Sequence, residues 1–217
     1  MRRAASEDEG AGVGAWAAIV LAGGAARRMS GVDKVALPVG GRSLLSRVVA
    51  AATGAHPVVV VGPTRPLGAP VRWVVERPAG SGPLAALAAG LAALGETDPD
   101  EVAVLAGDLA GITSSTLDRL RAGRRSHPGA AGAVLLDHDG RPQWLIGVWS
   151  AAALRRALPA DPRDRSVRSV LGRLPRVEVA ACGVEALDVD TPDDLAAARR
   201  SVPSEPGGDD GGHSLGS

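Results

Sequence analysis

Residues 21–34 read Leu21-Ala22-Gly23-Gly24-Ala25-Ala26-Arg27-Arg28-Met29-Ser30-Gly31-Val32-Asp33-Lys34, and they directly follow an apolar run from Trp16 to Val20. A short, continuous apolar run is typical of a fully buried strand. The two adjacent glycines have no Cβ, so backbone N–H groups in such a turn can approach a phosphate closely. Arg27, Arg28 and Lys34 add three positive charges nearby. The combination indicates a site for a nucleoside triphosphate.

The spacing of this stretch differs from the two commonest phosphate loops. It contains neither G-x-x-x-x-G-K-[ST] nor G-x-G-x-x-G. On residue chemistry alone, an ordinary glycine-rich turn with solvated arginines explains the stretch about equally well, because isolated glycine motifs often match by chance. The remainder of the chain has to distinguish the two interpretations.

Apolar runs and helix signals alternate after the first loop. We expect strands at residues 58–61, 71–75 and 101–106, a helix capped by Ser43 and a helix from Pro83 to about residue 94. This alternation predicts an α/β fold of βαβ units, with a mostly parallel central sheet and helices on both faces. Ligands of such sheets bind at the carboxyl ends of the strands. Gly23-Gly24, Gly62 and Gly107-Asp108 all fall at such ends.

The second half of the chain is less regular. Strands at 131–136 and 144–149 could pair as a hairpin around the polar turn at 137–140, and short strands are expected at 177–179 and 186–189. Helices are expected from Ser115 to about 121, from Ser150 to 158, over 166–171, and from Thr191 to about 200. Thr191-Pro192-Asp193-Asp194 supplies the cap, the N1 proline and the N3 acid of a helix start.

Length and composition limit the class of protein. The 217 residues fit one α/β domain, which we place at 14–202 between flexible tails at 1–13 and 203–217. The 24 basic and 24 acidic residues give no net charge, which argues against a nucleic acid or an anionic membrane as the main partner. The single cysteine, Cys182, fits a reducing compartment.

The N-terminus resembles a signal peptide only superficially. Met1-Arg2-Arg3 precedes an apolar stretch, but Glu7-Asp8-Glu9 interrupts the approach to it. No expected helix reaches the roughly 20 apolar residues that cross a bilayer. We therefore expect a cytoplasmic protein.

Asp108 directly follows a buried strand and Gly107, at the sheet edge where residues 21–34 are also expected. A carboxylate on a rigid strand end suits Mg²⁺, which takes few protein oxygens and keeps waters and phosphates as its other ligands. Alternatively, Asp108 caps a following turn. The neighbouring phosphate loop favours the metal interpretation.

The motif L-A-G-G-x-x-x-R-M-S-G-x-D-K, followed by Leu37 and Gly40-Gly41, resembles the signature of the molybdenum cofactor guanylyltransferases, which are nucleotidyltransferases of Rossmann-like fold. Segments 81–87, 105–108, 143–149 and 188–195 are similar to later motifs of that family. The resemblance implies an enzyme that transfers GMP from Mg²⁺-bound GTP to the terminal phosphate of a molybdopterin-type cofactor and releases pyrophosphate. It also implies transient contact with proteins that deliver or receive that cofactor.

The resemblance assigns roles to individual positions. Lys34 would bind phosphate and stabilise charge in the transition state, Arg28 would make a second phosphate contact, and Asp108 would bind nucleotide and Mg²⁺. These three form the implied catalytic group. The implied nucleotide-binding residues are Leu21, Ala22, Gly23, Gly24, Lys34 and Asp108.

Three positions depart from the family pattern. Ala110 stands where the family usually has proline, and Gln143-Trp144 replaces the start of its P-L-x-G segment. Arg77 stands where the family often has an aspartate that helps to read the nucleotide, a role that the adjacent Glu76 could take. Asp190 is either a second metal or substrate contact or, with Asp188, part of a turn before the Thr191 cap.

Other functions remain open on sequence alone. Arg163, Arg165 and Arg168 could meet an anionic acceptor, although such a run is more often a solvated face. A relative that uses CTP on the same acceptor, or couples a nucleotide to another small phosphorylated acid, is the nearest enzymatic alternative; L-A-G-G favours the guanylyl branch, because relatives often read L-A-A-G. A non-catalytic nucleotide-binding homologue is the other alternative, against which the intact Lys34 and Asp108 argue.

Overall fold

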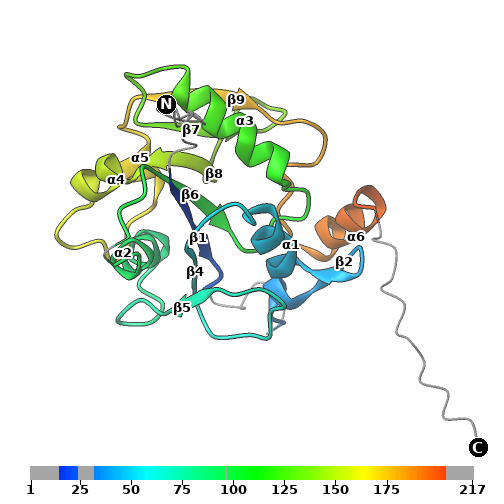
Figure 1. The fold of residues 1–217 in the computed structure, drawn as a ribbon. Coiled ribbons are helices and arrows are strands. Elements are labelled where there is room, and N and C mark those ends of the chain that lie inside the picture. The colour runs from blue at the N-terminus through cyan, green and yellow to red at the C-terminus, as the bar shows by residue number, and fades with distance from the viewer. Residues whose placement is uncertain (1–14, 24–31, 96, 204–217) are drawn as a thin grey trace, which may run out of the picture.

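A computed structural model gives the fold and describes residues 15–23, 32–95 and 97–203. Seven strands form one sheet in the order β5-β4-β1-β6-β8-β7-β9, with helices over both faces (Figure 1). The strands are β1 (Trp16–Leu21), β4 (Val58–Val61), β5 (Arg72–Val74), β6 (Glu101–Ala106), β7 (Gly132–Leu136), β8 (Pro142–Ser150) and β9 (Arg176–Ala180). Only β8, among these strands, runs against its neighbours. The predicted Rossmann-like α/β fold is confirmed.

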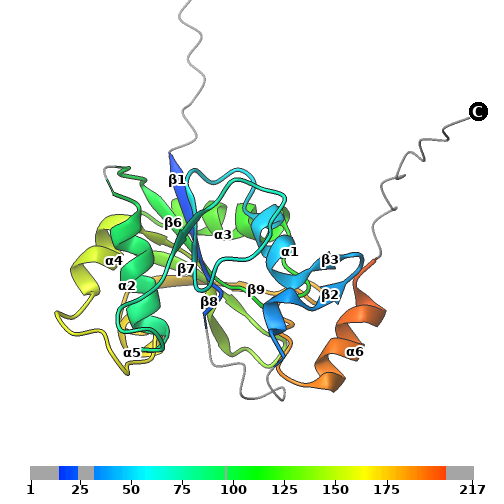
Figure 2. The ribbon, with the colours of Figure 1, turned by 90° about the horizontal axis from the view of Figure 1, so that it is seen from below.

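Strand β1 shows why helices cover both faces of the sheet. All six of its side chains are buried, and successive side chains of a strand point to opposite faces. Ala18 and Val20 pack with side chains of α1 (Leu44–Ala51) and α3 (Ser114–Arg125). Ala17 and Ile19 pack with α2 (Pro83–Ala93), α4 (Ala151–Ala157) and α5 (Arg168–Leu171). Figure 2 shows the sheet between these two helical layers.

A third, smaller apolar cluster lies at one side of the sheet. The short strands β2 (Pro38–Val39) and β3 (Arg42–Ser43) form a hairpin beside α6 (Pro192–Ser201), as Figure 2 shows. Val39 and Leu44 pack there against Val189 and Ala198, together with Ala110 from the loop after β6. This cluster fixes the last segment of the chain beside that loop.

The capping predictions are confirmed at three helices. The Ser43 and Ser150 hydroxyls accept hydrogen bonds from the N–H groups of Ser46 and Ala153. Thr191 and Asp194 form the predicted capping box of α6, with proline at N1. These signals are local, so the sequence alone contains them.

Two element predictions need correction. Helix α3 begins at Ser114, one residue before the expected start at Ser115, because Thr113 and Thr116 form its capping box. It continues to Arg125, whereas the expected end was near residue 121. The expected strand at 186–189 is wrong, because this segment makes only an isolated bridge between Asp188 and Leu109. The tails predicted at 1–13 and 203–217 lie outside the described residues, apart from residue 203. Within the described ranges, no helix has the length and apolar character needed to cross a bilayer.

Candidate active site

Glycines allow three loops to meet at the carboxyl ends of β1, β4 and β6. The Gly107 N–H donates to the Leu21 carbonyl at 2.9 Å, and a Cβ on Gly107 would lie 3.2 Å from the Ala22 Cα. Gly62 has a φ of 147°, and a Cβ there would lie 2.7 Å from the Gly23 nitrogen. Side chains at 62 and 107 would therefore push these loops away from the turn at Ala22 and Gly23.

Lys34 lies between two carboxylates at this edge of the sheet. It begins the 3-10 helix η2 (Lys34–Ala36), and its Nζ lies 2.5 Å from an Asp190 oxygen and 3.3 Å from an Asp108 oxygen. Burial by itself would lower the pKa of Lys34, but the hydrogen bond to Asp190 and the charge of Asp108 outweigh burial and raise this pKa. Lys34 is therefore a fixed positive charge at neutral pH.

Asp190 reaches Lys34 because its segment is bound to the loop after β6. The Ala110 N–H donates to the Leu187 carbonyl at 2.9 Å, and the Val189 N–H donates to the Asp108 carbonyl at 3.2 Å. Proline at position 110, the residue usual in the family, has no N–H to make the first of these bonds. The departure at Ala110 therefore adds a bond that holds the two acidic segments together.

Glu185 anchors the same segment to α3. It accepts hydrogen bonds from Thr116 at 2.7 Å, from Arg119 at 2.6 and 2.8 Å and from the Cys182 N–H at 2.8 Å. Burial raises the pKa of the Glu185 carboxyl, but these hydrogen bonds outweigh burial and lower the pKa to about 2. Residues 187–190 are thus held from both sides.

The site carries more negative than positive charge among its described residues. Asp108, Asp188 and Asp190 oppose the single charge of Lys34. Burial, together with the charges of Asp190 and Asp108, raises the pKa of Asp188. An excess of crowded carboxylates is what a divalent cation would relieve.

The protein side chains alone do not complete the coordination of a divalent metal here, so waters or substrate phosphates would have to supply the other ligands. In the described part of the chain, no group of three His, Cys, Asp or Glu side chains is arranged to hold a metal ion by itself. Mg²⁺ needs no such cage, because it is usually held by one or two carboxylates and completed by waters and substrate phosphates. Asp108 and Asp190, on either side of Lys34, are carboxylates of this kind.

The structure places some of the sequence-predicted residues and leaves others outside its range. Leu21 and Ala22 are buried beside Gly107, while Gly23 is exposed at the turn. Gly24 and Arg28 lie outside the described residues. The sequence patterns do not single out Asp33, whose carboxylate accepts two hydrogen bonds from Arg65, of 2.6 and 3.0 Å. The only sequence signal for Asp33 was its place in the D-K pair of the first motif.

A cavity of about 300 Å³ adjoins the acidic residues on the side of β8. Asp188, Trp144 and Arg168 contribute to its lining. The Arg176 guanidinium lies over the Trp144 ring, 4.9 Å from its centroid. Arg163 instead forms a surface pair with Asp161 at 2.8 Å, as expected of a solvated face.

A larger cavity, of about 1110 Å³, opens elsewhere, between α1 and residues 67–72. Its lining is largely apolar or small and includes Val49, Val58 and Leu67. Arg42, His56 and Arg72 also line it, but no carboxylate does among the residues that the structure describes. We place the site at the acidic edge of the sheet, because charge and converging loops identify a phosphate and metal site better than volume does.

Comparison with known proteins identifies relatives along most of the chain. A family model described as a MobA-like NTP transferase domain matches residues 18–178. A molybdenum cofactor guanylyltransferase of Mesorhizobium japonicum is 33% identical over 206 residues, which cover 87% of this chain and 96% of that protein. Another, from Rhodopseudomonas palustris, is 32% identical over 200 residues, which cover 84% of this chain and 92% of that protein.

Solved structures share the fold. Molybdopterin-guanine dinucleotide biosynthesis protein A from Archaeoglobus fulgidus matches with a TM-score of 0.61 at 22% identity, over 84% of this chain and 96% of that one. Rv0371c from Mycobacterium tuberculosis, in complex with manganese, gives 0.66 at 22% identity over 87% and 100%. A 2-C-methyl-D-erythritol 4-phosphate cytidylyltransferase from Thermus thermophilus gives 0.62 at 21% identity over 85% and 97%. At these identities the likeness concerns the fold alone.

Proposed function

The chain belongs to the MobA-like NTP transferase family, and from this premise we propose that it transfers GMP from GTP to a molybdopterin-type cofactor and releases pyrophosphate. The observation that carries the proposal is the position of Lys34, held between Asp108 and Asp190 where the loops after β1 and β6 meet. Sequence relatives named molybdenum cofactor guanylyltransferases favour GTP over CTP. The cytidylyltransferase likeness concerns only the fold.

The chemistry needs charge and position more than a protein nucleophile. An oxygen of the acceptor's phosphate attacks the α-phosphorus of GTP, a new P–O bond forms, and the bond from the α-phosphorus to the leaving pyrophosphate breaks. We assign to Lys34 the stabilisation of the negative charge that grows on the phosphate oxygens in this step. Leu21, Ala22, Gly23 and Gly24 would hold the nucleotide, and Arg28 would add a phosphate contact.

We assign a divalent metal, Mg²⁺ by preference, to Asp108, with Asp190 as the second carboxylate beside it. A metal bound there would neutralise the phosphates as they approach each other. Two further observations support a divalent metal: the excess of carboxylates over cations among the described residues of the site, and the manganese complex of a protein of the same fold.

The acceptor would lie on the β8 side of Asp188. The cavity of about 300 Å³ there offers the Trp144 ring and the positively charged Arg168 to a planar, phosphorylated molecule. A transient contact with proteins that deliver or receive the cofactor, and the cytoplasmic location expected from the sequence, remain predictions.

Calorimetric titration of the purified protein with GTP and with CTP, each with and without Mg²⁺, tests the function directly. We expect magnesium-dependent binding of GTP and much weaker binding of CTP. Lys34→Met should then lower the rate of GMP transfer on the order of 10²–10³-fold, because one charge-stabilising donor is lost. Asp108→Asn should abolish the magnesium dependence of binding.

Arg155→Ala is the matched control, because Arg155 carries the same charge as Lys34 but pairs with the exposed Asp98 far from the site. It should leave transfer unchanged. If the protein binds CTP more tightly than GTP, the reaction would still be nucleotide transfer, but the transferred nucleotide would be CMP. Binding of neither nucleotide in the presence of the acceptor would refute catalysis and favour a non-catalytic homologue.

A further inference from the structure

Asp33 is a carboxylate beside Lys34 that the proposed chemistry does not use. It directly precedes η2, a position where a short acidic side chain commonly caps a helix, but its side chain makes no cap bond there. Its two oxygens instead accept hydrogen bonds from Arg65 Nε at 2.6 Å and Arg65 Nη2 at 3.0 Å. A paired contact of this kind fixes both distance and orientation.

Arg65 is itself fixed within the loop that follows β4. Its Nη1 donates to the Pro63 carbonyl at 2.8 Å, and its side chain is only 17% exposed. The loop begins at Gly62, whose N–H donates to the Val74 carbonyl of β5 at 2.8 Å. Because the guanidinium fork is planar and three of its N–H groups are used, Asp33 is bound to a partner with little freedom.

The loop after β4 contacts the proposed nucleotide stretch at two points. The first is the glycine turn, since a Cβ on Gly62 would lie 2.7 Å from the Gly23 nitrogen. The second is Asp33, which Arg65 binds 32 positions along the chain. One loop therefore sets the separation between the glycine turn and the lysine of the site.

Lys34 needs a hold that does not depend on the carboxylates of the site. Asp108 and Asp190 contact its ammonium group, and they are also the carboxylates to which we assign the metal. Oxygens shared with a metal hold the ammonium group less firmly, and the four-carbon stem of lysine is flexible. The backbone of Lys34 is then held by its two neighbours, Val35, which is 8% exposed and packs in the core, and the bound Asp33.

We propose that Arg65 is a positioning residue for nucleotide transfer, an inference that rests on the proposed function. Arg65 binds Asp33, and Asp33 fixes the backbone from which Lys34 reaches the phosphates. A displacement of about 1 Å in a reacting arrangement can lower a rate about a hundredfold. The role requires the fork of arginine as well as its charge, because lysine cannot make the paired contact.

Two plainer roles for Arg65 predict different measurements. As a support for the fold alone, Arg65 would change the amount of folded protein and leave the rate per folded molecule unchanged. As a direct phosphate ligand, it would act independently of Lys34, so its loss would lower the rate by the same factor with or without that lysine. A positioning residue acts through Lys34, so its loss has little further effect once Lys34 is gone.

Arg65→Ala in two backgrounds, the wild type and Lys34→Met, separates these roles. We would measure kcat for GMP transfer per folded molecule, the binding of GTP by calorimetry, and the folded fraction by urea denaturation. In the wild type, kcat should fall about 10–100-fold, and the affinity for GTP should fall by a smaller factor. In Lys34→Met, the same substitution should change kcat by less than about twofold.

Asp33→Asn is the second variant, because it keeps the size of the side chain and removes the charge that Arg65 binds. It should lower kcat by about as much as Arg65→Ala, and the double variant should be no slower than either single one. If Arg65→Ala does not fold, Asp33→Asn makes the same comparison in both backgrounds. Arg65→Lys should recover only part of the rate.

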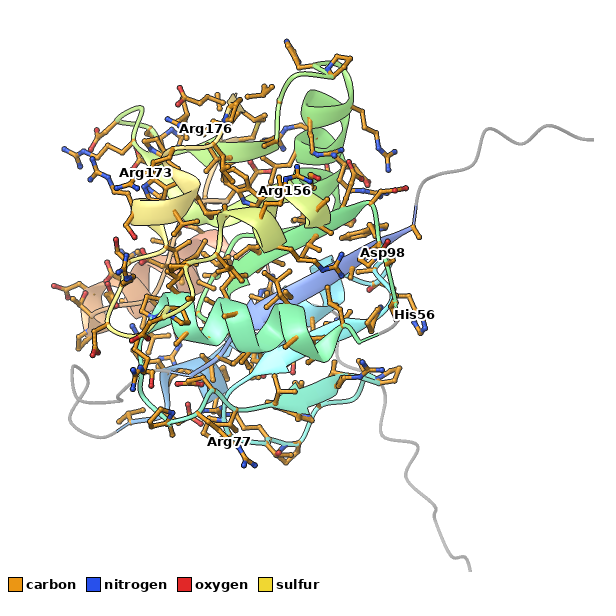
Figure 3. All side chains as sticks on the ribbon, turned by 90° about the vertical axis from the view of Figure 1, so that its left-hand side faces the viewer. His56, Arg77, Asp98, Arg156, Arg173 and Arg176 are labelled. Atoms are coloured by element: carbon orange, nitrogen blue, oxygen red, sulfur yellow. The ribbon has the colours of Figure 1, made fainter. Side chains whose placement is uncertain are left out.

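Arg155→Ala is the matched control, because Arg155 also pairs with an aspartate, Asp98, but at the opposite end of the sheet. Figure 3 shows Asp98 beside the end of the sheet at which β1 begins. This variant should leave kcat and GTP binding unchanged in both backgrounds.

An equal fall of kcat in the two backgrounds would refute positioning through Lys34, as would an unchanged kcat in both Arg65→Ala and Asp33→Asn. Either result leaves the proposed function standing, because the wild type still transfers GMP. A wild-type protein that neither binds GTP nor transfers GMP would refute the proposed function itself.

Discussion

The two ends of the central sheet use charge in opposite ways. At the amino end of β6, Glu101 is 1% exposed and binds three guanidinium groups, those of Arg121, Arg124 and Arg125, at 3.0, 2.9 and 2.7 Å. At the carboxyl end of the same strand, Asp108 is about a quarter exposed and shares a single ammonium group with Asp190. One end surrounds a carboxylate with cations, and the other surrounds a cation with carboxylates.

The difference separates a structural ion cluster from a binding site. We call the Glu101 cluster closed because both oxygens of its carboxylate are paired with guanidinium groups, although Arg121 Nη2 and Arg124 Nε are buried without a hydrogen-bond partner. The Arg121 guanidinium also lies over the Trp16 ring, 4.4 Å from its centroid. The Lys34 cluster is incomplete, because its three neighbouring carboxylates exceed its positive charge. A cluster of the first kind contributes stability, while one of the second kind keeps affinity for a ligand that completes it.

The largest effect on stability should follow from breaking the closed cluster. Glu101→Gln leaves three partly buried guanidinium groups without a counterion, so we expect the free energy of unfolding to fall by about 3–5 kcal/mol. Denaturation by urea at neutral pH measures this. Transfer activity per folded molecule should not change.

Arg155→Ala is again the control, now for stability, because the pair of Arg155 with Asp98 is exposed and should contribute at most about 1 kcal/mol. If Glu101→Gln lowers the free energy of unfolding by less than about 1 kcal/mol, the Glu101 cluster does not stabilise the fold more than an exposed ion pair does.

An intermediate effect should be a loss of stability at acidic pH that depends on Glu185, the residue that anchors residues 187–190 to α3. Its folded pKa of about 2 lies below its ordinary value of 4.5, so its contribution is complete above pH 4.5 and disappears as the pH falls toward 2. The shift corresponds to roughly 3 kcal/mol. The difference in unfolding free energy between the wild type and Glu185→Gln, followed from pH 6 to pH 2, should shrink by about this amount. A difference that stays constant over this range would contradict the assignment.

The smallest effect should be a gain in stability at the incomplete cluster. Asp188 has a raised pKa, so its ionised form opposes folding, and stability falls as the pH rises through the titration of this carboxyl. Asp188→Asn should therefore increase the free energy of unfolding at pH 7 by a few tenths of a kcal/mol. At pH 3, where the carboxyl is largely protonated, the gain should disappear. A loss of stability at pH 7 would mean that Asp188 is a supporting group.

Sequence patterns anticipated the parts of this molecule that depend on near neighbours. The apolar runs at β1 and β4, the caps of α1, α4 and α6, and the position of Asp108 after a buried strand all follow from residues adjacent in the chain. Buried strands and helix caps are local requirements, which a single sequence contains.

Pairings between distant polar residues could not be obtained in this way. The arginines at the end of α3 are typical of a solvated surface until Glu101 is known to lie beside them. The choice between two roles for Asp190 and the burial of Glu76 beside the exposed Arg77 were likewise open. Each depends on which segment the fold brings alongside, and charge alone does not specify its partner.

The partnership of Lys34 and Asp190 has a consequence for synthesis of the protein on the ribosome. The two residues are 156 positions apart, and the segment that carries Asp190 is held by bonds to the loop after β6. The loop to which we assign nucleotide binding, together with Asp108, is therefore translated long before Asp190, the carboxylate proposed to complete the site. A nascent or truncated chain that ends before Asp190 lacks one of the two carboxylates that hold Lys34. We therefore expect nucleotide transfer only after the segment of Asp190, which packs against α6, has been made.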